Sequence, residues 1–235
     1  MGVVPILVAL PGTLCSPRVF DRLAAGVAGT VDVDAVDWMG GPGPWRIGDV
    51  ADFVAARIEQ RHGGPVLVAG HSTGGAIALA LAAARPDLVS GLLLANTGAH
   101  MRGHGDVDRI LGTIANGWGP RLHAAVLDRS FAEPVPAEVR DVLLAYAAGV
   151  PRAAALEVLR SQRDEDLTPL LPGITCPVTL LHGVHDRART VADAETIAAG
   201  LPDCDLRTLH TGHTPVWEDA PATADAVRDL LARTG

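Results

Sequence analysis

One short segment of the sequence holds a residue that could act as a nucleophile. The segment Gly70-His71-Ser72-Thr73-Gly74 has the pattern G-x-S-x-G and lies between an apolar run and an alanine-rich stretch. A strand that passes directly into a helix leaves the serine on a sharp, strained turn, where side chains at the two glycine positions would collide. The pattern predicts that the Ser72 hydroxyl stands clear of the backbone, at the positive end of the following helix. The alternative is a glycine-rich turn in which Ser72 caps the helix.

A serine hydroxyl becomes a good nucleophile only when a base removes its proton, and nine histidines are candidates for that base. His213 is the best placed, because it follows the last predicted strand on a short loop before the final helix. His71 lies too close to Ser72 along the chain to approach its hydroxyl well. His182 and His210 lie in or at predicted strand ends, where core or rim positions are expected. The other five have no comparable setting: His62, His100, His104, His123 and His185.

The base in turn needs a carboxylate that fixes its tautomer and stabilises the imidazolium. Asp186 follows a predicted strand directly, and the carboxyl end of that strand faces the same edge as Ser72 and His213. The alternative role for Asp186 is to cap the helix expected from Thr190. The predicted catalytic residues therefore occur in the order Ser72, Asp186, His213.

Acyl transfer through a serine also needs backbone N–H groups that bind the oxyanion of the tetrahedral intermediate. One donor is expected to be the amide of Thr73, the residue after the nucleophile. The other is expected from the loop after the first strand. There Thr13 follows a flexible glycine and is the first choice, with Leu14 as the second.

The elements that position these residues can be inferred from the apolar pattern. Short runs rich in leucine and β-branched residues predict strands at 4–10, 31–37, 65–70, 91–95, 178–182 and 206–210. Helical stretches are expected at 17–28, 47–62, 72–85, 190–199 and 222–233. Apolar strands that alternate with helices predict an α/β fold with a parallel sheet covered on both faces. If the second strand lies outside the first, the strand order is 2-1-3-4-5-6, and ligands bind where the chain reverses direction beside the first strand.

One interval, from about residue 99 to residue 167, interrupts this alternation. It contains several helical patterns and no strand candidate. Because about seventy residues are more than one crossover needs, we interpret the interval as a helical insertion that projects from the strand ends. The alternative is additional helix covering the sheet.

Together these motifs resemble the α/β-hydrolase fold superfamily. The matching parts are the turn 70–74, the acid turn from Gly183 to Asp186, the segment Gly212-His213-Thr214-Pro215 and the loop Pro11-Gly12-Thr13. Their order and spacing cover essentially the whole chain, and the resemblance implies the same three catalytic residues. Two features depart from the family pattern. The loop has Pro11-Gly12 where the family often has His-Gly, and no antiparallel hairpin precedes the first parallel strand, so about six strands are expected instead of eight.

The resemblance also implies a domain organisation and a reaction. The α/β-hydrolase core would comprise residues 1–97 and 169–235, and residues 98–168 would form a helical cap, or lid, over the nucleophile. Small hydrolases of this type are similar to pimeloyl-carrier-protein methyl esterase, enol-lactonases and thioesterases. The implied function is a serine hydrolase that cleaves a carboxylic ester or lactone of a small to medium acyl substrate, without a metal or organic cofactor. The alternatives are a thioesterase acting on CoA or carrier-protein acyl groups, a non-hydrolytic acyltransferase, lyase or cyclase, and a receptor that binds ligand without turnover.

Four residues are predicted to bind substrate. Trp118 lies between two glycines of the insertion, and Trp217 lies four residues after His213, where it would form the rear wall. Leu14 in the first loop and Met101 at the start of the insertion complete the set. Three arginines of the insertion are candidates for binding a substrate carboxylate or phosphate, although surface arginines usually serve solubility: Arg102, Arg109 and Arg121.

The composition limits the other possibilities. All 19 Lys and Arg residues are arginines, which excludes a lysine Schiff base, a pyridoxal-phosphate enzyme and a P-loop nucleotide site. The formal net charge of −8 makes nucleic acid and anionic membranes poor partners. Three distant cysteines fit a reducing compartment, and no apolar run of about 18 residues predicts a membrane span. We therefore expect a cytoplasmic protein with a small-molecule substrate; the sequence makes no prediction of oligomeric state.

Overall fold

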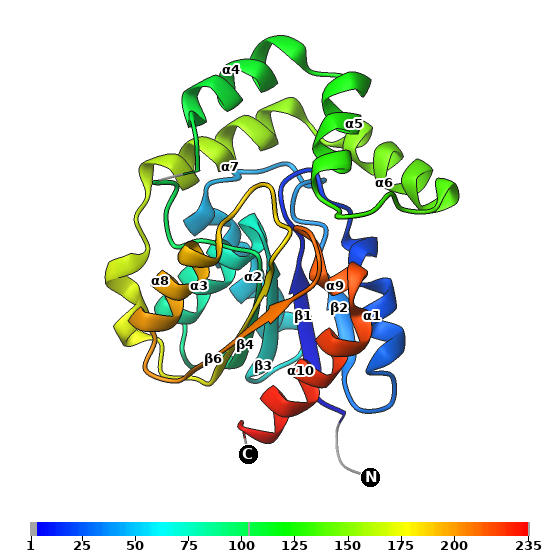
Figure 1. The fold of residues 1–235 in the computed structure, drawn as a ribbon. Coiled ribbons are helices and arrows are strands. Elements are labelled where there is room, and N and C mark those ends of the chain that lie inside the picture. The colour runs from blue at the N-terminus through cyan, green and yellow to red at the C-terminus, as the bar shows by residue number, and fades with distance from the viewer. Residues whose placement is uncertain (1–3, 103, 235) are drawn as a thin grey trace.

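The computed structural model describes residues 4–102 and 104–234 and is built on one parallel sheet (Figure 1). Its strands are β1 (Ile6–Leu10), β2 (Asp32–Ala35), β3 (Val66–His71), β4 (Val89–Ala95), β5 (Val178–Gly183) and β6 (Cys204–Leu209). The strand order is β2-β1-β3-β4-β5-β6, and every neighbouring pair is parallel. The predicted six-stranded sheet and its order are therefore confirmed. β2 is added on one side of β1, and β3 and the later strands on the other side, so the order of strand addition reverses between the neighbouring strands β1 and β3.

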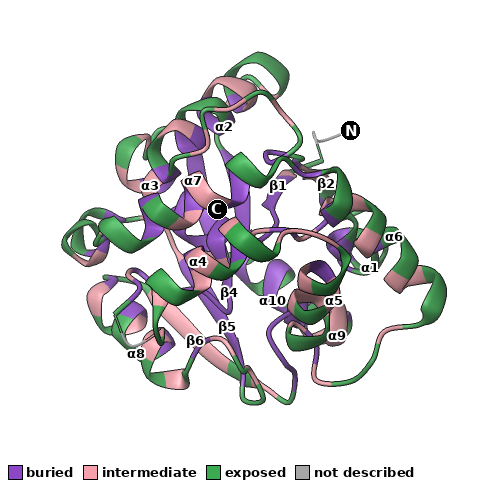
Figure 2. Ribbon diagram, turned by 90° about the horizontal axis from the view of Figure 1, so that it is seen from above, coloured by how far each residue is buried: buried purple, intermediate pink, exposed green. Residues whose placement is uncertain are grey.

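The strands are apolar on both faces because helices cover both sides of the sheet. In β1, Val8 and Leu10 pack into one core cluster, and Leu7 and Ala9 pack into the other. The first cluster is shared with α2 (Ile47–Arg61) and α3 (Thr73–Ala84), and the second with α10 (Ala220–Ala232). The central strands are buried, whereas the edge strand β6 is half-buried (Figure 2). This burial on both faces explains why the strands read as continuous apolar runs.

Several helices begin or end at residues other than those predicted from the sequence. The stretch expected at 17–28 divides into a 3₁₀ helix, Pro17–Phe20, and α1 (Asp21–Gly26), because the Ser16 side chain accepts a hydrogen bond from the Arg18 amide and starts a tight first turn. The predicted final helix begins earlier, with a short α9 (Pro215–Glu218) before α10. Two further helices complete the core: α8 (Val191–Gly200) and a second 3₁₀ helix, Thr168–Gly173.

Between β4 and the second 3₁₀ helix, the described residues form four α-helices above the sheet (Figure 1). They are α4 (Val107–Gly117), α5 (Pro120–Arg129), α6 (Ala137–Gly149) and α7 (Arg152–Asp164). No strand occurs between β4 and β5 in the part of this interval that the structure describes, as the sequence predicts. Within residues 4–102 and 104–234, no single helix is long and apolar enough to cross a membrane, and only the pair α6 and α7, bent by 85°, meets that test together.

Helix α7 is joined to the core at the start of α2. The Ser161 hydroxyl oxygen accepts a hydrogen bond from the Ile47 amide at 2.9 Å, and the Glu157 carboxylate accepts one from the Trp45 amide at 3.1 Å. The first turn of a helix has amides without intrahelical acceptors, and the residue that precedes α2, Arg46, provides no side-chain cap. Side chains of α7 therefore satisfy this end of α2 and fix the helical insertion to the sheet.

The Ser161→Ala substitution tests this connection. It leaves the buried Ile47 amide without an acceptor, so we expect the free energy of unfolding to fall by about 1–2 kcal/mol. Urea denaturation measures the change. Thr196→Ala is the matched control, because its exposed hydroxyl donates only to the Ala192 carbonyl oxygen within α8. Equal stability of the Ser161→Ala protein and the wild type would contradict the assignment.

Candidate active site

Ser72 lies on the turn between β3 and α3 with backbone angles that few serines adopt. Its φ is +54° and its ψ is −121°, a strained conformation for a residue with a Cβ. A Cβ at Gly70 would lie 2.5 Å from the Gly74 carbonyl oxygen, and a Cβ at Gly74 would overlap the Leu10 carbonyl oxygen. Both glycines are therefore required by close approach, as the G-x-S-x-G pattern predicts.

The strained turn is held by the strand next to it. The Ser72 amide donates to the Ala95 carbonyl oxygen at 2.9 Å, and the Thr97 hydroxyl donates to the Ser72 carbonyl oxygen at 2.7 Å. Both Ala95 and Thr97 belong to the end of β4 or the loop that follows it. Thr97 is fully buried, and it has no motif that would have identified it in the sequence.

His213 and Asp186 form a direct pair below the cavity. The His213 Nδ1 atom lies 2.7 Å from the Asp186 Oδ2 atom, and the Asp186 side chain is fully buried. Burial alone would raise the pKa of Asp186, but hydrogen bonds from His213, from the Asn96 side chain and from the Ala188 amide hold it well below its usual range. The carboxylate therefore stays ionised, keeps the Nδ1 proton of His213 directed toward it and leaves Nε2 as the basic atom.

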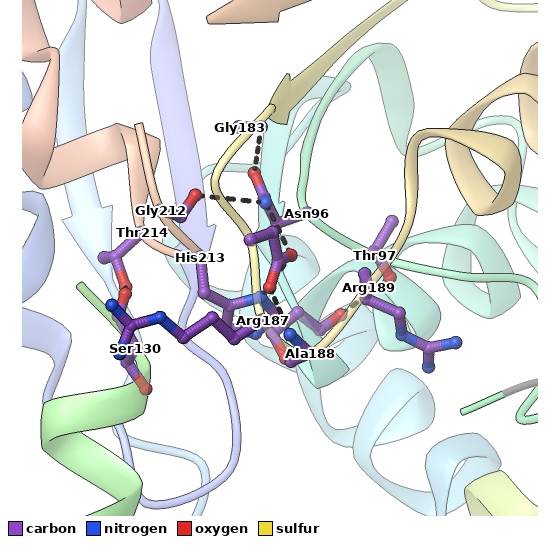
Figure 3. Close-up of polar contacts among 12 residues, drawn as sticks. Asn96, Thr97, Ser130, Gly183, Arg187, Ala188, Arg189, Gly212, His213 and Thr214 are labelled. Carbon is purple, nitrogen blue, oxygen red and sulfur yellow. Dashed lines mark hydrogen bonds and ion pairs between the residues drawn. The ribbon is translucent and has the colours of Figure 1, made fainter. Parts of the chain in front are cut away.

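Asn96 connects the loops that carry these two residues (Figure 3). Its side-chain amide donates to the Asp186 carboxylate at 2.7 Å and to the Gly212 carbonyl oxygen at 3.2 Å, and its carbonyl oxygen accepts from the Gly183 amide at 3.1 Å. Asn96 is fully buried and has φ +46°, which asparagine tolerates better than most residues. The sequence analysis missed this residue; its place directly after an apolar strand was the available signal.

Two further side chains hold the backbone around His213. The Glu218 carboxylate accepts hydrogen bonds from the amides of Gly212 at 3.0 Å, Thr214 at 3.0 Å and Ala132 at 2.8 Å. His71 Nε2 lies 2.8 Å from the His213 carbonyl oxygen. Burial, followed by the nearby His213, lowers the pKa of His71 to about 3. His71 is therefore neutral at physiological pH and donates from Nε2 to that oxygen, so it supports the loop and is unsuited to act as the base.

A cavity of about 180 Å³ brings the predicted residues together. Ser72 and His213 both line it, and helices α4, α5 and α7 form its upper wall. Among the described residues, no hydrogen bond joins the Ser72 hydroxyl to the His213 ring; such contacts are often long before substrate binds. Leu14 and Met101 lie in the wall, as predicted, with further apolar side chains: Ile110, Ile114, Val126 and Leu159.

The loop after β1 lies against Ser72 and lines the same cavity. A Cβ at Gly12 would lie 2.9 Å from the Ser72 Cβ, so only glycine lets this loop approach so closely. The Leu14 amide donates to the Met39 sulfur at 3.2 Å, which removes Leu14 as the second choice for an oxyanion donor. Within the described chain the amides of Thr13 and Thr73 have no acceptor, and their hydroxyl oxygens lie 2.8 Å apart.

Other residues that the sequence predicts to contact substrate do not line the cavity. Trp118 packs edge-on against His123, with ring centroids 4.8 Å apart, and Trp217 carries the Arg22 guanidinium 4.0 Å above its ring. Neither tryptophan lines the cavity, because Trp118, in the turn between α4 and α5, and Trp217, in α9, each pack against another side chain. The three arginines suggested for anion binding also lie elsewhere: Arg102, which pairs with Asp166 at 2.7 Å, and the exposed Arg109 and Arg121. No three His, Cys, Asp or Glu side chains converge on a metal position in the described parts of the chain.

The chain belongs to the alpha/beta hydrolase family, which it matches over residues 7–226. A 51-residue segment is 51% identical to lipase LipV of Mycobacterium tuberculosis, a match that covers 22% of this chain and 20% of LipV. The fold is similar to an esterase from Exiguobacterium antarcticum, with a TM-score of 0.88, 20% identity and coverage of 99% of this chain and 93% of that one. It is also similar to an enol-lactonase from Burkholderia xenovorans LB400, with a TM-score of 0.85, 22% identity and coverage of 98% and 92%.

The Asn96→Asp substitution tests the electrostatics of this site. Two carboxylates at hydrogen-bond distance share one proton, so the pKa of one of them is raised in the folded state, whereas both ionise at about pH 4 in the unfolded chain. The folded state then binds more protons than the unfolded state, so stability is lost as pH rises. We expect a loss of about 2–4 kcal/mol at neutral pH and a smaller loss near the unfolded pKa.

Urea unfolding of the Asn96→Asp protein at neutral and at mildly acidic pH measures this difference. The matched control is Asn116→Asp, because Asn116 is exposed on α4 and donates only to the Gly112 carbonyl oxygen of its own helix. We expect this control to show little change at either pH. A loss of stability in Asn96→Asp that is the same at both pH values would show that the charge beside Asp186 is not the cause.

Proposed function

We propose that the protein is a serine hydrolase that cleaves a carboxylic ester or lactone of a small to medium acyl substrate. Ser72 is the proposed nucleophile, His213 the base and Asp186 the carboxylate that orients it. The observation that carries the proposal is the His213–Asp186 pair at 2.7 Å, at the same cavity as a serine on a strained turn. The family and the esterases and lactonases of similar fold agree with this reaction class.

The proposed reaction has two half-reactions through an acyl-enzyme. His213 Nε2 takes the Ser72 proton while the serine oxygen attacks the acyl carbon, and the carbonyl oxygen becomes an oxyanion. The C–O bond to the leaving group then breaks, and the imidazolium returns its proton to that oxygen. In the second half-reaction His213 removes a proton from water, which attacks the acyl carbon and releases the acid and the Ser72 hydroxyl.

Two features of the site support this assignment of roles. The Thr13 and Thr73 amides have no other acceptor among the described residues, so both are available to the oxyanion. Each such donor contributes about 2.7–4 kcal/mol to transition-state stabilisation in a known serine hydrolase. Cys15, whose thiol is the only one in the cavity lining among the described residues, is a poor competitor as nucleophile, because burial raises its pKa to about 12.

The shape of the site supports a small acyl group. Its volume of about 180 Å³ is below the range of about 300–1,000 Å³ that holds drug-sized ligands. We propose that residues 98–168 act as the cap over a core of residues 1–97 and 169–235, since α4, α5 and α7 provide the upper wall. A small-molecule substrate, a cytoplasmic location and a reaction without cofactors remain predictions from the sequence.

The Ser72→Ala substitution is the first test of this function. Turnover of short-chain esters and lactones should fall by about 10⁴-fold or more, because the acyl-enzyme can no longer form. Rates are measured by ester or lactone consumption. Unchanged turnover in Ser72→Ala would overturn the proposal.

A fluorophosphonate label gives an independent test that needs no substrate. Mass spectrometry should locate the phosphonyl group on Ser72 and not on Ser130, which lines the same cavity but donates its hydroxyl proton to the Val126 carbonyl oxygen. Labelling that is absent, or that falls on Ser130, would contradict the assigned nucleophile. Matched oxygen esters and thioesters then separate esterase from thioesterase activity, and transfer of the acyl group to an added alcohol in preference to water would identify an acyltransferase.

A further inference from the structure

The charges around the cavity contrast with those of the whole protein. The chain has a formal net charge of −8, yet the cavity lining contains no aspartate or glutamate among the described residues. It contains two arginines, Arg129 and Arg189, together with His104. Acidic residues outnumber basic ones in the chain, 27 to 19, so a lining with two arginines and no carboxylate has the opposite charge balance to the whole protein.

Arg189 is a buried cation with weak compensation. Its side chain is only 4% exposed, and its guanidinium donates to two neutral acceptors, the His100 carbonyl oxygen at 2.8 Å and the Met101 sulfur at 3.0 Å. Its one carboxylate partner among the described residues is Asp193, whose Oδ1 atom lies 3.9 Å from the guanidinium, while Asp193 Oδ2 accepts from the Thr190 amide and hydroxyl. A buried cation is costly unless its charge is compensated, and a single carboxylate at 3.9 Å leaves room for an anionic ligand to compensate it further.

Arg129 reaches the same cavity from the last turn of α5. Its guanidinium donates to the Arg187 carbonyl oxygen at 2.6 Å, and the described residues place no carboxylate within 4.0 Å of it. Arginines elsewhere on the surface do find carboxylates, such as Arg163 with Asp108 at 2.6 Å. The charge of Arg129 is therefore free to act on a ligand.

His104 adds an unsatisfied polar atom to this wall. Its Nδ1 is buried, and among the described residues it has no hydrogen-bond partner. Burial and then the positive charges of Arg189 and Arg129 lower the pKa of His104 to about 4, and all three residues line the same cavity. A neutral imidazole can donate one hydrogen bond to an oxygen placed between the cations.

We propose that Arg129, Arg189 and His104 form a subsite that binds a carboxylate carried by the substrate. The inference rests on the proposed function and specifies the substrate class: an ester or lactone with a second, ionised carboxyl group. The planar guanidinium matches the two oxygens of a carboxylate. The cavity of about 180 Å³ limits the spacer between that carboxylate and the scissile bond to a few carbon atoms.

Matched substrates test the subsite. Monomethyl glutarate and its carboxamide differ only in the charge of the distal group and place that group on the acyl side. The pair 3-acetoxypropanoate and 3-acetoxypropanamide places it on the leaving-group side. In at least one pair we expect kcat/KM to be about tenfold or more higher for the carboxylate, the factor that one charge-assisted hydrogen bond supplies. A ratio near or below one in both pairs would overturn the proposal.

Variants connect that preference to the named residues. Arg129→Gln should reduce the carboxylate-to-carboxamide ratio about tenfold or more, and His104→Ala should reduce it in the same direction. Arg121→Gln is the matched control, since Arg121 is an exposed arginine of α5 outside the cavity lining, and it should keep the wild-type ratio. Arg189→Gln adds a third variant, with thermal unfolding as a check on folding because Arg189 is buried. A ratio that survives in both Arg129→Gln and His104→Ala would overturn the subsite.

Binding to the Ser72→Ala protein separates this inference from the proposed function. Calorimetric titration should show that monomethyl glutarate or 3-acetoxypropanoate binds about tenfold or more tightly than its carboxamide, whether or not the wild type hydrolyses either ester. Absence of turnover together with this preference would reject the hydrolase assignment and keep the subsite. Hydrolysis of both members of each pair at equal rates, with equal binding, would keep the hydrolase and reject the subsite.

Discussion

The arrangement of this site depends on one buried hydrogen bond, between the His213 ring and the Asp186 carboxylate at 2.7 Å. A carboxylate without exposure is stable only when several donors replace water, and here Asn96 and the Ala188 amide join His213 in that role. The other side chains around the pair serve to keep it in place. Glu218 binds three amides of the neighbouring segments, and His71 binds the His213 carbonyl oxygen.

The order of the parallel strands explains how distant segments meet. In a parallel sheet all strand ends of one kind lie at one edge, so the loops after β1, β3, β4, β5 and β6 share a rim. Asn96 follows the strand that lies between the strand before Ser72 and the strand before Asp186, and its side chain can therefore contact the acid loop while Thr97 holds the serine turn. The sheet brings these loops close together, and the two residues that follow β4, Asn96 and Thr97, fix their orientation by hydrogen bonds.

A feature of this fold could be predicted from the sequence when neighbouring residues in the chain determine it, and not when the tertiary fold does. The features that the local sequence determines are the apolar runs of the buried strands, the glycines around Ser72 and the positions of Asp186 and His213 after strands. Asn96 and Glu218 could not be predicted, because their hydrogen bonds join loops that only the tertiary fold brings together. Trp118 and Trp217, which the sequence predicts to bind substrate, lie outside the cavity lining, because sequence spacing does not show which neighbour a side chain packs against.

The cationic wall changes how the proposed chemistry should be viewed. In the proposed reaction the imidazole of His213 becomes positively charged during attack, and Asp186, 2.7 Å from its Nδ1 atom, would stabilise that charge. Arg129 and Arg189 line the same cavity and would repel that charge, the buried Arg189 more strongly than the exposed Arg129, whose charge water screens. A substrate carboxylate held by the arginines would cancel part of this repulsion as the transition state forms. The binding energy of the substrate carboxylate would then raise the rate of the chemical step as well as the affinity. Only an interaction that is stronger in the transition state than in the bound substrate has this effect on the rate.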